Sequence, residues 1–325
     1  MPYCRSCGAS IKSGVKFCTS CGAPVRVPAR APVKVPVRAP VRKLKAPARE
    51  APVEKPVVVA PPTGKPIMTK SVKYVLVGVV IAVVLGSVTA VILVSSGPQD
   101  VGDFKVVYGQ AQSPACQKWS LAFQTSKGFE TLADALNQTL ALPRDVDIVL
   151  AETGQVNSWY NPSTYQLVMT YDLMAYFDQT FSGYTDPETR VVGTTLFVFF
   201  HELGHGLIHV YDLPITGKEE DAVDQLSILI LLGAGGEGEN AVLNGALWFY
   251  EESQKTHENL PFWDTHSLPQ QRYYNILAWV YGSDPQKFSW LVEWGYLPQD
   301  RAVYAQDEYQ KMYHGWETLL SPYMK

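Results

Sequence analysis

A single run of uncharged, apolar residues divides this chain of 325 residues into two parts with different chemistry. The run extends from Tyr74 to Val94 and is as long as a helix that crosses a bilayer, which needs about 20 residues. It begins too far from Met1 to be a cleaved signal peptide. The sequence therefore predicts one transmembrane helix over residues 72–96 that anchors the chain in the cell membrane.

Charge is distributed unevenly on the two sides of this run. Residues 1–73 contain 15 Lys/Arg and 2 Asp/Glu, a balance of +13, whereas the remainder contains 12 Lys/Arg and 29 Asp/Glu, a balance of −17. The basic flank of a transmembrane helix stays in the cytoplasm. We therefore expect a single-pass protein whose N-terminus is cytoplasmic and whose acidic C-terminal part is extracytoplasmic.

Four of the five cysteines form two CxxC pairs near the N-terminus, Cys4 with Cys7 and Cys18 with Cys21. Each pair can direct two thiolates at one ion, and two pairs complete a tetrahedral zinc site. A segment of about twenty residues buries too little apolar surface to fold without such an ion. Residues 1–23 are therefore predicted to form a zinc ribbon around one structural zinc ion. They resemble the short ribbons that open many prokaryotic membrane proteins, and a cytoplasmic protein is a candidate partner.

Residues 24–71 are predicted to be a linker. Proline recurs at every fourth position from Pro24 to Pro40, and a basic residue recurs at every fourth position from Arg26 to Arg42. Proline removes the backbone donors that a helix or sheet requires, so an extended polyproline-like spacer is expected. Its basic side chains could contact anionic lipid head groups. A nucleic-acid partner is not expected.

Residues 97–325 have the pattern of one α+β domain. Strands are expected at Asp145–Leu150 and Tyr165–Tyr171, with a turn at residues 161–163. The fifth cysteine, Cys116, is expected to be a small buried apolar residue. Long helical patterns follow the strands near residues 191–210, 219–232, 239–252 and 269–281. The very apolar segments within the first two patterns are interpreted as core helices.

The first of these helices contains the sequence HELGH, in which His201 and His205 are four residues apart. Side chains at this spacing share one face of a helix and can bind one metal ion. Glu202 then lies beside the ion, where it can take a proton from a water molecule and pass it to a leaving amine. The bland alternative is a pair of core histidines on a buried helix. His209 continues the spacing and is interpreted as structural.

A third protein ligand is expected from the acidic segment GKEEDAVDQLS that follows. Glu220 is the first candidate for a metal ligand, and Asp224 can accept a hydrogen bond from the free N–H of a ligating histidine. This spacing after HExxH resembles that of thermolysin-like Glu-zincins. Glu219 and Asp221 remain alternatives for the ligand, and an ordinary acidic helix N-terminus remains an alternative for the whole segment.

Further along, the segment DTHSLPQQRYYNILAWVYGSDP forms a polar and aromatic entry to a helix. The resemblance to Glu-zincins implies a separate histidine or tyrosine that stabilises the oxyanion formed on a scissile carbonyl. His266 and Tyr273 are the catalytic candidates, with Tyr274 beside them. The structural alternative is a capped amphipathic helix, with Ser267 as the N-cap and Pro269 in the first turn.

These three segments, in this order, resemble a family catalogued as metallopeptidases of unknown function. The stretch NSWYNPSTYQLVMTYDL also resembles the strand region of that family, and the resemblance covers about residues 104–320. It implies a zincin-like α+β metallopeptidase domain with an edge strand near residues 165–171 that would hold the substrate backbone. It does not imply a particular substrate.

Two hypotheses follow from these patterns. The first is a membrane-anchored zinc-dependent peptidase that acts on peptide or protein substrates and carries one catalytic and one structural zinc ion. The alternative is a non-catalytic membrane-anchored binding or sensing protein with a vestigial zinc site. The intact Glu202 favours the first, because a degenerate enzyme would be expected to lose its general base early. An intramembrane protease is a weaker idea, because the apolar stretch Val191–Phe200 is shorter than a membrane span.

Overall fold

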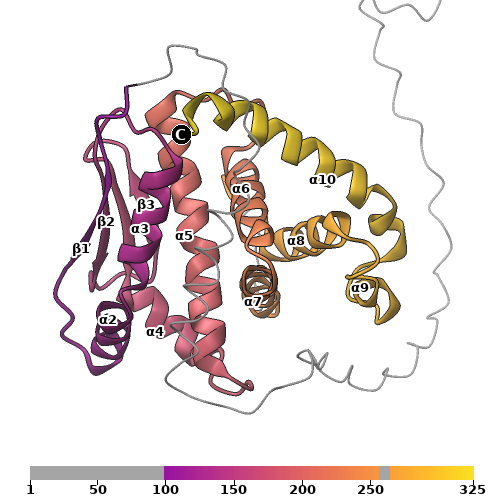
Figure 1. The fold of residues 1–325 in the computed structure, drawn as a ribbon. Coiled ribbons are helices and arrows are strands. Elements are labelled where there is room, and N and C mark those ends of the chain that lie inside the picture. Colours follow the sequence, from indigo (N-terminus) through magenta and orange to yellow (C-terminus); the bar gives the residue numbers. More distant parts are fainter. Residues whose placement is uncertain (1–98, 256–263) are drawn as a thin grey trace, which may run out of the picture. The chain divides into compact units, whose positions relative to one another are not determined.

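The computed structural model describes residues 99–255 and 264–325. The predicted ribbon (1–23), linker (24–71) and transmembrane helix (72–96) lie outside these ranges. Within the C-terminal domain, the described ranges omit residues 97–98 and 256–263. It is an α+β fold, as expected (Figure 1). Its elements in chain order are β1 Phe104–Tyr108, α2 Pro114–Ser126, α3 Gly128–Thr139, β2 Val146–Ala151, β3 Ser158–Asn161, β4 Gln166–Thr170, α4 Tyr171–Thr180, α5 Pro187–Tyr211, α6 Glu219–Gly233, α7 Gly236–Ser253, α8 Pro269–Ser283, α9 Trp290–Glu293, α10 Gln299–Leu320 and the short 3₁₀ helix η1 Ser321–Tyr323.

The four strands form one small mixed sheet in the order β1-β2-β4-β3. β1 pairs in parallel with β2 and β2 with β4, while β3 pairs antiparallel to β4, with Trp159 opposite Val168. Both predicted strands are confirmed as β2 and β4, and the expected turn joins β3 to β4. The expectation that the second of them is an edge strand is wrong. The turn folds β3 back onto β4, so β3 is the edge.

The sheet buries mainly one face. Along β2, Val146, Ile148 and Leu150 are buried, and the residues between them are partly exposed. Because alternate residues of a strand point to opposite faces, this pattern means that one face packs on the core. Helices α3 and α5 lie on that same side of the sheet (Figure 1), where the rings of Phe129 and Phe199 meet edge to face at 5.4 Å.

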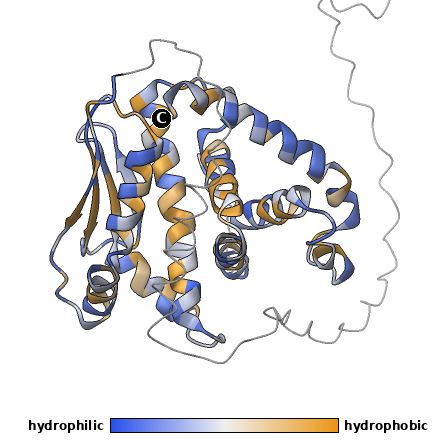
Figure 2. Ribbon diagram, viewed as in Figure 1, coloured by the Kyte–Doolittle hydropathy of each residue, from blue (hydrophilic) through white to orange (hydrophobic). Residues whose placement is uncertain are grey.

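Helix α5 is the centre of the domain and carries the HELGH sequence. Pro187 occupies its first turn, where the missing N–H costs nothing. The helix contains 25 residues, more than the expected pattern, and among the described residues only α5 is long and apolar enough to cross a membrane. However, 89% of its most apolar window is buried inside the protein, so α5 is a core helix (Figure 2). Its phenylalanines at 197, 199 and 200 are fully buried, each worth about 1.5–3 kcal/mol of transfer free energy.

Helices α6, α7 and α8 complete the core on the side of α5 away from the sheet, and each confirms a predicted helix. The close approach of α6 depends on Gly204 of the HELGH sequence. A Cβ atom at this position would lie 2.7 Å from Cγ1 and 2.8 Å from Cβ of Val223, closer than atoms can pack. The glycine therefore lets the first turns of α6 lie directly against the two histidines.

Two smaller expectations were tested by the same helices. Cys116 is buried and unpaired, as expected for a small apolar residue. The predicted N-cap of α8 is wrong by one residue: Leu268 is the N-cap and Pro269 the first helical residue. The Ser267 hydroxyl instead donates a hydrogen bond to Asp221 of α6, at 2.7 Å. This bond ties the segment before α8 to the start of α6.

Candidate metal centre

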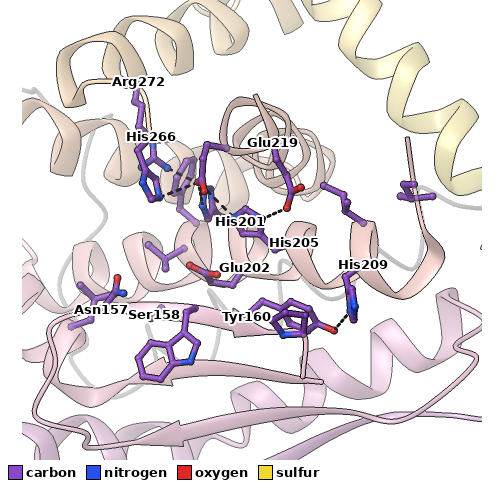
Figure 3. A pocket seen from close by; sticks show the side chains of 18 of the residues that line it. Asn157, Ser158, Tyr160, His201, Glu202, His205, His209, Glu219, His266 and Arg272 are labelled. Atoms are coloured by element: carbon purple, nitrogen blue, oxygen red, sulfur yellow. Dashed lines mark hydrogen bonds and ion pairs between the residues drawn. The ribbon is translucent and has the colours of Figure 1, made fainter. Parts of the chain in front are cut away.

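Helix α5 presents His201, Glu202 and His205 to a cavity of about 700 Å³. The cavity lies between α5 and the edge strand β3, and it is bordered by the start of α6 and the segment that leads into α8. Figure 3 shows the two histidines and Glu202 projecting from neighbouring turns of the helix toward this space. His266 and Arg272 approach from the side opposite β3. The structure thus brings together four segments that are distant in the sequence.

His201 is held by a buried carboxylate. Its Nδ1 atom lies 2.8 Å from Oδ1 of Asp224, and the two side chains are 6% and 3% exposed. Arg272 of α8 donates two hydrogen bonds to the same carboxylate, at 2.6 and 2.8 Å. Burial raises the pKa of Asp224, but the charges and hydrogen bonds of Arg272 and His201 together outweigh it and lower that pKa to about 2. Asp224 is therefore an anion that accepts the Nδ1 proton, so the Nε2 lone pair of His201 faces the cavity.

The three consecutive acidic residues of α6 have three different partners. Glu219 accepts a hydrogen bond from Nδ1 of His205 at 2.7 Å, and Asp221 accepts the hydroxyl proton of Ser267. Only Glu220 points to the histidine Nε2 atoms. The alternatives left open by the sequence are thereby separated, since Glu219 orients a histidine and Asp221 fastens a loop.

Glu220 Oε2 is the common point of the cluster. It lies 3.3 Å from Nε2 of His201, 3.6 Å from Nε2 of His205 and 3.0 Å from Nε2 of His266. This oxygen is buried and makes no hydrogen bond within the described part of the chain. A buried carboxylate oxygen among imidazole nitrogens that can give up their protons to a metal is the donor set that zinc prefers. The residues present therefore fit a metal ion.

The local charges also favour a cation. Glu202, Glu219, Glu220 and Asp224 surround the histidines, and Arg272 is the basic residue that contacts them in the described structure. Burial lowers the pKa of His205, but Glu220 and Glu219 outweigh it and raise that pKa to about 9. The acidic residues thus favour positive charge at the imidazoles, and a metal ion could replace the protons there. Burial raises the pKa of Glu202 above its usual value.

The two catalytic candidates, His266 before α8 and Tyr273 within it, occupy different places in the structure. His266 lies in the cluster, with Nε2 next to Glu220. Tyr273 does not line the cavity, and its ring instead packs on Tyr250 of α7 and on Tyr274. Successive residues of a helix are rotated by roughly 100°, so a helix that directs Arg272 into the site turns Tyr273 toward α7. The expected role of Tyr273 at the reacting carbonyl is therefore corrected.

Sequence reasoning missed two contributors. Arg272 gives no signal in the sequence, because an arginine in the first turn of a helix is ordinarily a surface residue. Tyr160 of β3 lines the opposite wall of the cavity, and its hydroxyl lies 3.0 Å from Nδ1 of His209 (Figure 3). That contact supports the structural interpretation of His209. The i, i+4 continuation of the histidines to His209 is visible in the sequence, but its contact with Tyr160 of β3 is not.

Comparison with known families agrees with this geometry. Residues 108–320 match a family described as "Putative metallopeptidase". The chain belongs to this family. Residues 3–25 match a zinc-ribbon domain, which agrees with the ribbon expected from the two CxxC pairs. Neither curated proteins nor solved structures gave a match.

Proposed function

We propose that this chain is a membrane-anchored zinc peptidase whose metal is held by His201, His205 and Glu220. The observation that carries the proposal is the convergence of imidazole Nε2 atoms on the buried, unsatisfied Oε2 of Glu220, with Glu202 beside them in the cavity. When bound, a zinc ion supplies Lewis-acid polarisation of a peptide carbonyl and lowers the pKa of a water molecule.

Glu202 is the general base of the proposal. It precedes His205 by three residues and lies on the cavity wall, but its carboxylate is not one of the groups gathered around Glu220. It accepts the proton of the attacking water and delivers it to the leaving amine nitrogen. Burial raises the pKa of Glu202, which makes its carboxylate a stronger base than that of an exposed glutamate.

Strand β3 is the proposed docking site for an extended substrate. It is the edge of the sheet, and Ser158, Trp159 and Tyr160 line the cavity below the histidines. An edge strand offers unpaired backbone N–H and C=O groups to a peptide that adds as a further strand. A peptide bound in this way runs along the wall opposite His201 and Glu202.

The N-terminal region is assigned from its sequence. We propose that Cys4, Cys7, Cys18 and Cys21 bind a second, structural zinc ion and that Tyr74–Val94 spans the membrane. The basic linker then lies on the cytoplasmic side and the catalytic domain on the outer side. A protein partner of the ribbon would be cytoplasmic, and lipid is the partner of the single span.

Two glutamate variants of the zinc-loaded, full-length protein in detergent test the catalytic assignment. Glu202→Gln keeps the size of the side chain but removes its basicity, so hydrolysis of a peptide mixture should fall by about 10² to 10⁴. Its zinc content and melting temperature should change little, because Glu202 is not a ligand. Glu220→Gln replaces an anionic ligand by a neutral one and should lower zinc affinity and rate together.

The contrast between the two variants decides the roles. Parental turnover in Glu202→Gln would contradict the proposed mechanism. A zinc-loaded parent that cleaves no peptide of a broad mixture would instead support the non-catalytic binding or sensing protein.

A further inference from the structure

His266 approaches Glu220 more closely than either histidine of the HELGH sequence. Its Nε2 atom lies 3.0 Å from Oε2 of Glu220, compared with 3.3 Å for His201 and 3.6 Å for His205. The ligand atoms of His201, Glu220 and His266 lie within 4.8 Å of one another, close enough to bind one metal ion. His205 is not part of this group, although its Nε2 atom lies 3.6 Å from Oε2 of Glu220. His266 comes from the segment before α8, whereas His201 and His205 lie on α5 (Figure 3).

We propose that His266 is a fourth protein ligand of the metal, and that it acts as a displaceable cap over the position that a substrate or water must occupy. The proposal rests on the zinc site of the proposed function and adds a regulation of that site. It replaces the role in oxyanion stabilisation that the sequence indicated for His266.

The orientation of the ring argues for a ligand. Nδ1 of His266 lies 3.2 Å from Oδ1 of Asp264, which also accepts the backbone N–H of His266 at 2.9 Å. In a neutral imidazole this contact places the proton on Nδ1 and the lone pair on Nε2. Nε2 then presents its lone pair toward Glu220, as a metal ligand does, whereas a group that stabilises an oxyanion must donate a proton from that position.

The same arrangement repeats around the whole cluster. Asp224, Glu219 and Asp264 each hold the Nδ1 atom of one histidine, and each histidine turns its Nε2 atom toward Glu220. A carboxylate behind each imidazole is the usual support of histidines that ligate metals. Three histidines with this support point to three nitrogen ligands.

Four protein ligands would close a tetrahedral zinc site, whereas a catalytic site keeps one position open. One ligand must therefore leave, or the coordination number must rise, when a substrate binds. His266 is the ligand best suited to leave. Its side chain is 50% exposed and that of its partner Asp264 is 46% exposed, compared with 6% and 3% for His201 and Asp224. Exposed pairs of this kind contribute little stability.

Cadmium-113 NMR of the full-length protein in detergent tests the ligand assignment. Sulfur-ligated and nitrogen/oxygen-ligated cadmium give separate resonances, so the ribbon supplies an internal reference. We expect His266→Ala to shift the nitrogen/oxygen resonance, to leave the sulfur resonance in place, and to weaken cadmium affinity at that site by at least the roughly 10-fold that loss of an outer-shell partner costs. Added imidazole should restore the parental resonance.

The matched control is His314→Ala, which removes an exposed histidine of α10 whose side chain is 80% exposed. It should leave both resonances unchanged. His266→Gln is the second variant, in case the alanine protein does not fold, and it should shift the same resonance because an amide oxygen replaces a ring nitrogen. An unchanged resonance in both His266 variants would overturn the proposal while leaving the metal site intact.

Binding of acetohydroxamate, a small ligand that coordinates metals, tests the cap. Its affinity for the zinc-loaded protein should rise in His266→Ala, by roughly tenfold if the cap is closed about nine-tenths of the time. An equal or weaker affinity would show that His266 does not compete for the open position. If the parent gives no nitrogen/oxygen resonance at all, the zinc site of the proposed function fails, and the cap fails with it.

Discussion

His201 and His266 face the same carboxylate oxygen, but the protein supports them in very different ways. His201 sits on the central helix, and its Nδ1 atom is fixed by Asp224, which is fixed in turn by two hydrogen bonds from Arg272. His266 sits in a loop, and its Nδ1 atom meets Asp264, only two residues before it in the sequence. One histidine is supported by three helices and the other by its own loop.

His205 lies between these extremes. It belongs to the central helix, yet its orienting carboxylate, Glu219, is 48% exposed. The strength of support therefore falls from His201 to His205 to His266, in step with the exposure of the three histidine side chains, which is 6%, 19% and 50%. In the proposed site, the buried pair of His201 and Asp224 would hold the metal in place, and the exposed His266 would give way to the substrate.

The largest expected effect comes from removing the buried carboxylate of Asp224, which holds both His201 and Arg272. Asp224→Asn keeps the shape of the side chain but leaves Arg272 as an uncompensated cation that is 11% exposed. Removing one partner of a buried ion pair typically costs about 3–5 kcal/mol. We expect a loss of this order in the free energy of unfolding, together with weaker zinc binding because His201 is no longer oriented.

Urea unfolding followed by tryptophan fluorescence measures this loss. All eight tryptophans lie beyond residue 118, so the signal reports on the C-terminal domain alone. The control is the double variant Asp224→Asn with Arg272→Met, which removes the stranded charge and should recover part of the stability. A cost below about 1 kcal/mol for Asp224→Asn alone would mean that the buried side is not the stronger support.

A smaller effect is expected from separating α6 from α5 without changing any charge. In Gly204→Ala the added Cβ atom would lie 2.7 Å from Val223 Cγ1, so α6 must shift. Overpacking of this kind typically costs about 1–3 kcal/mol. Because α6 carries Glu219, Glu220 and Asp224, zinc affinity should fall as well.

Gly206→Ala is the matched control on the same helix. Its Cβ atom would approach the Tyr160 ring no closer than 3.4 Å, which is an ordinary contact. Unfolding and zinc titration should therefore distinguish two identical substitutions two residues apart. Equal effects would show that the contact between α5 and α6 does not set the geometry of the site.

Much of this arrangement follows from local sequence patterns. The helical period placed His201 and His205 on one face, and the strand pattern located β2 and β4, because both depend only on residues close in the sequence. The family resemblance is confirmed over residues 108–320. The sequence therefore predicted the helix that carries HELGH and the acidic segment that follows it.

The remaining details depend on packing between distant segments. The roles of Glu219, Glu220 and Asp221 depend on how α6 is rotated against α5, since consecutive helical residues diverge by roughly 100°. The same rotation of α8 decides that Arg272 and not Tyr273 enters the site. The edge position of β3 depends on how the strands are ordered, which the alternation of apolar residues does not encode. The assignment of individual ligands was therefore left open by the sequence.

The smallest expected effect tests the middle of the gradient. Glu219→Gln can still accept a hydrogen bond from Nδ1 of His205, but it removes the charge that polarises the ring. Because Glu219 is 48% exposed, unfolding should change by no more than about 0.5 kcal/mol, as for most surface substitutions. Zinc affinity should fall toward the lower end of the 10- to 100-fold range that outer-shell partners show, and clearly less than in Asp224→Asn. Competition with a calibrated chelator gives both affinities under one condition. If Glu219→Gln weakens zinc binding as much as Asp224→Asn, exposure does not rank the three supports. The ability of His266 to leave the metal would then have to come from its position in the loop rather than from the exposure of its side chain.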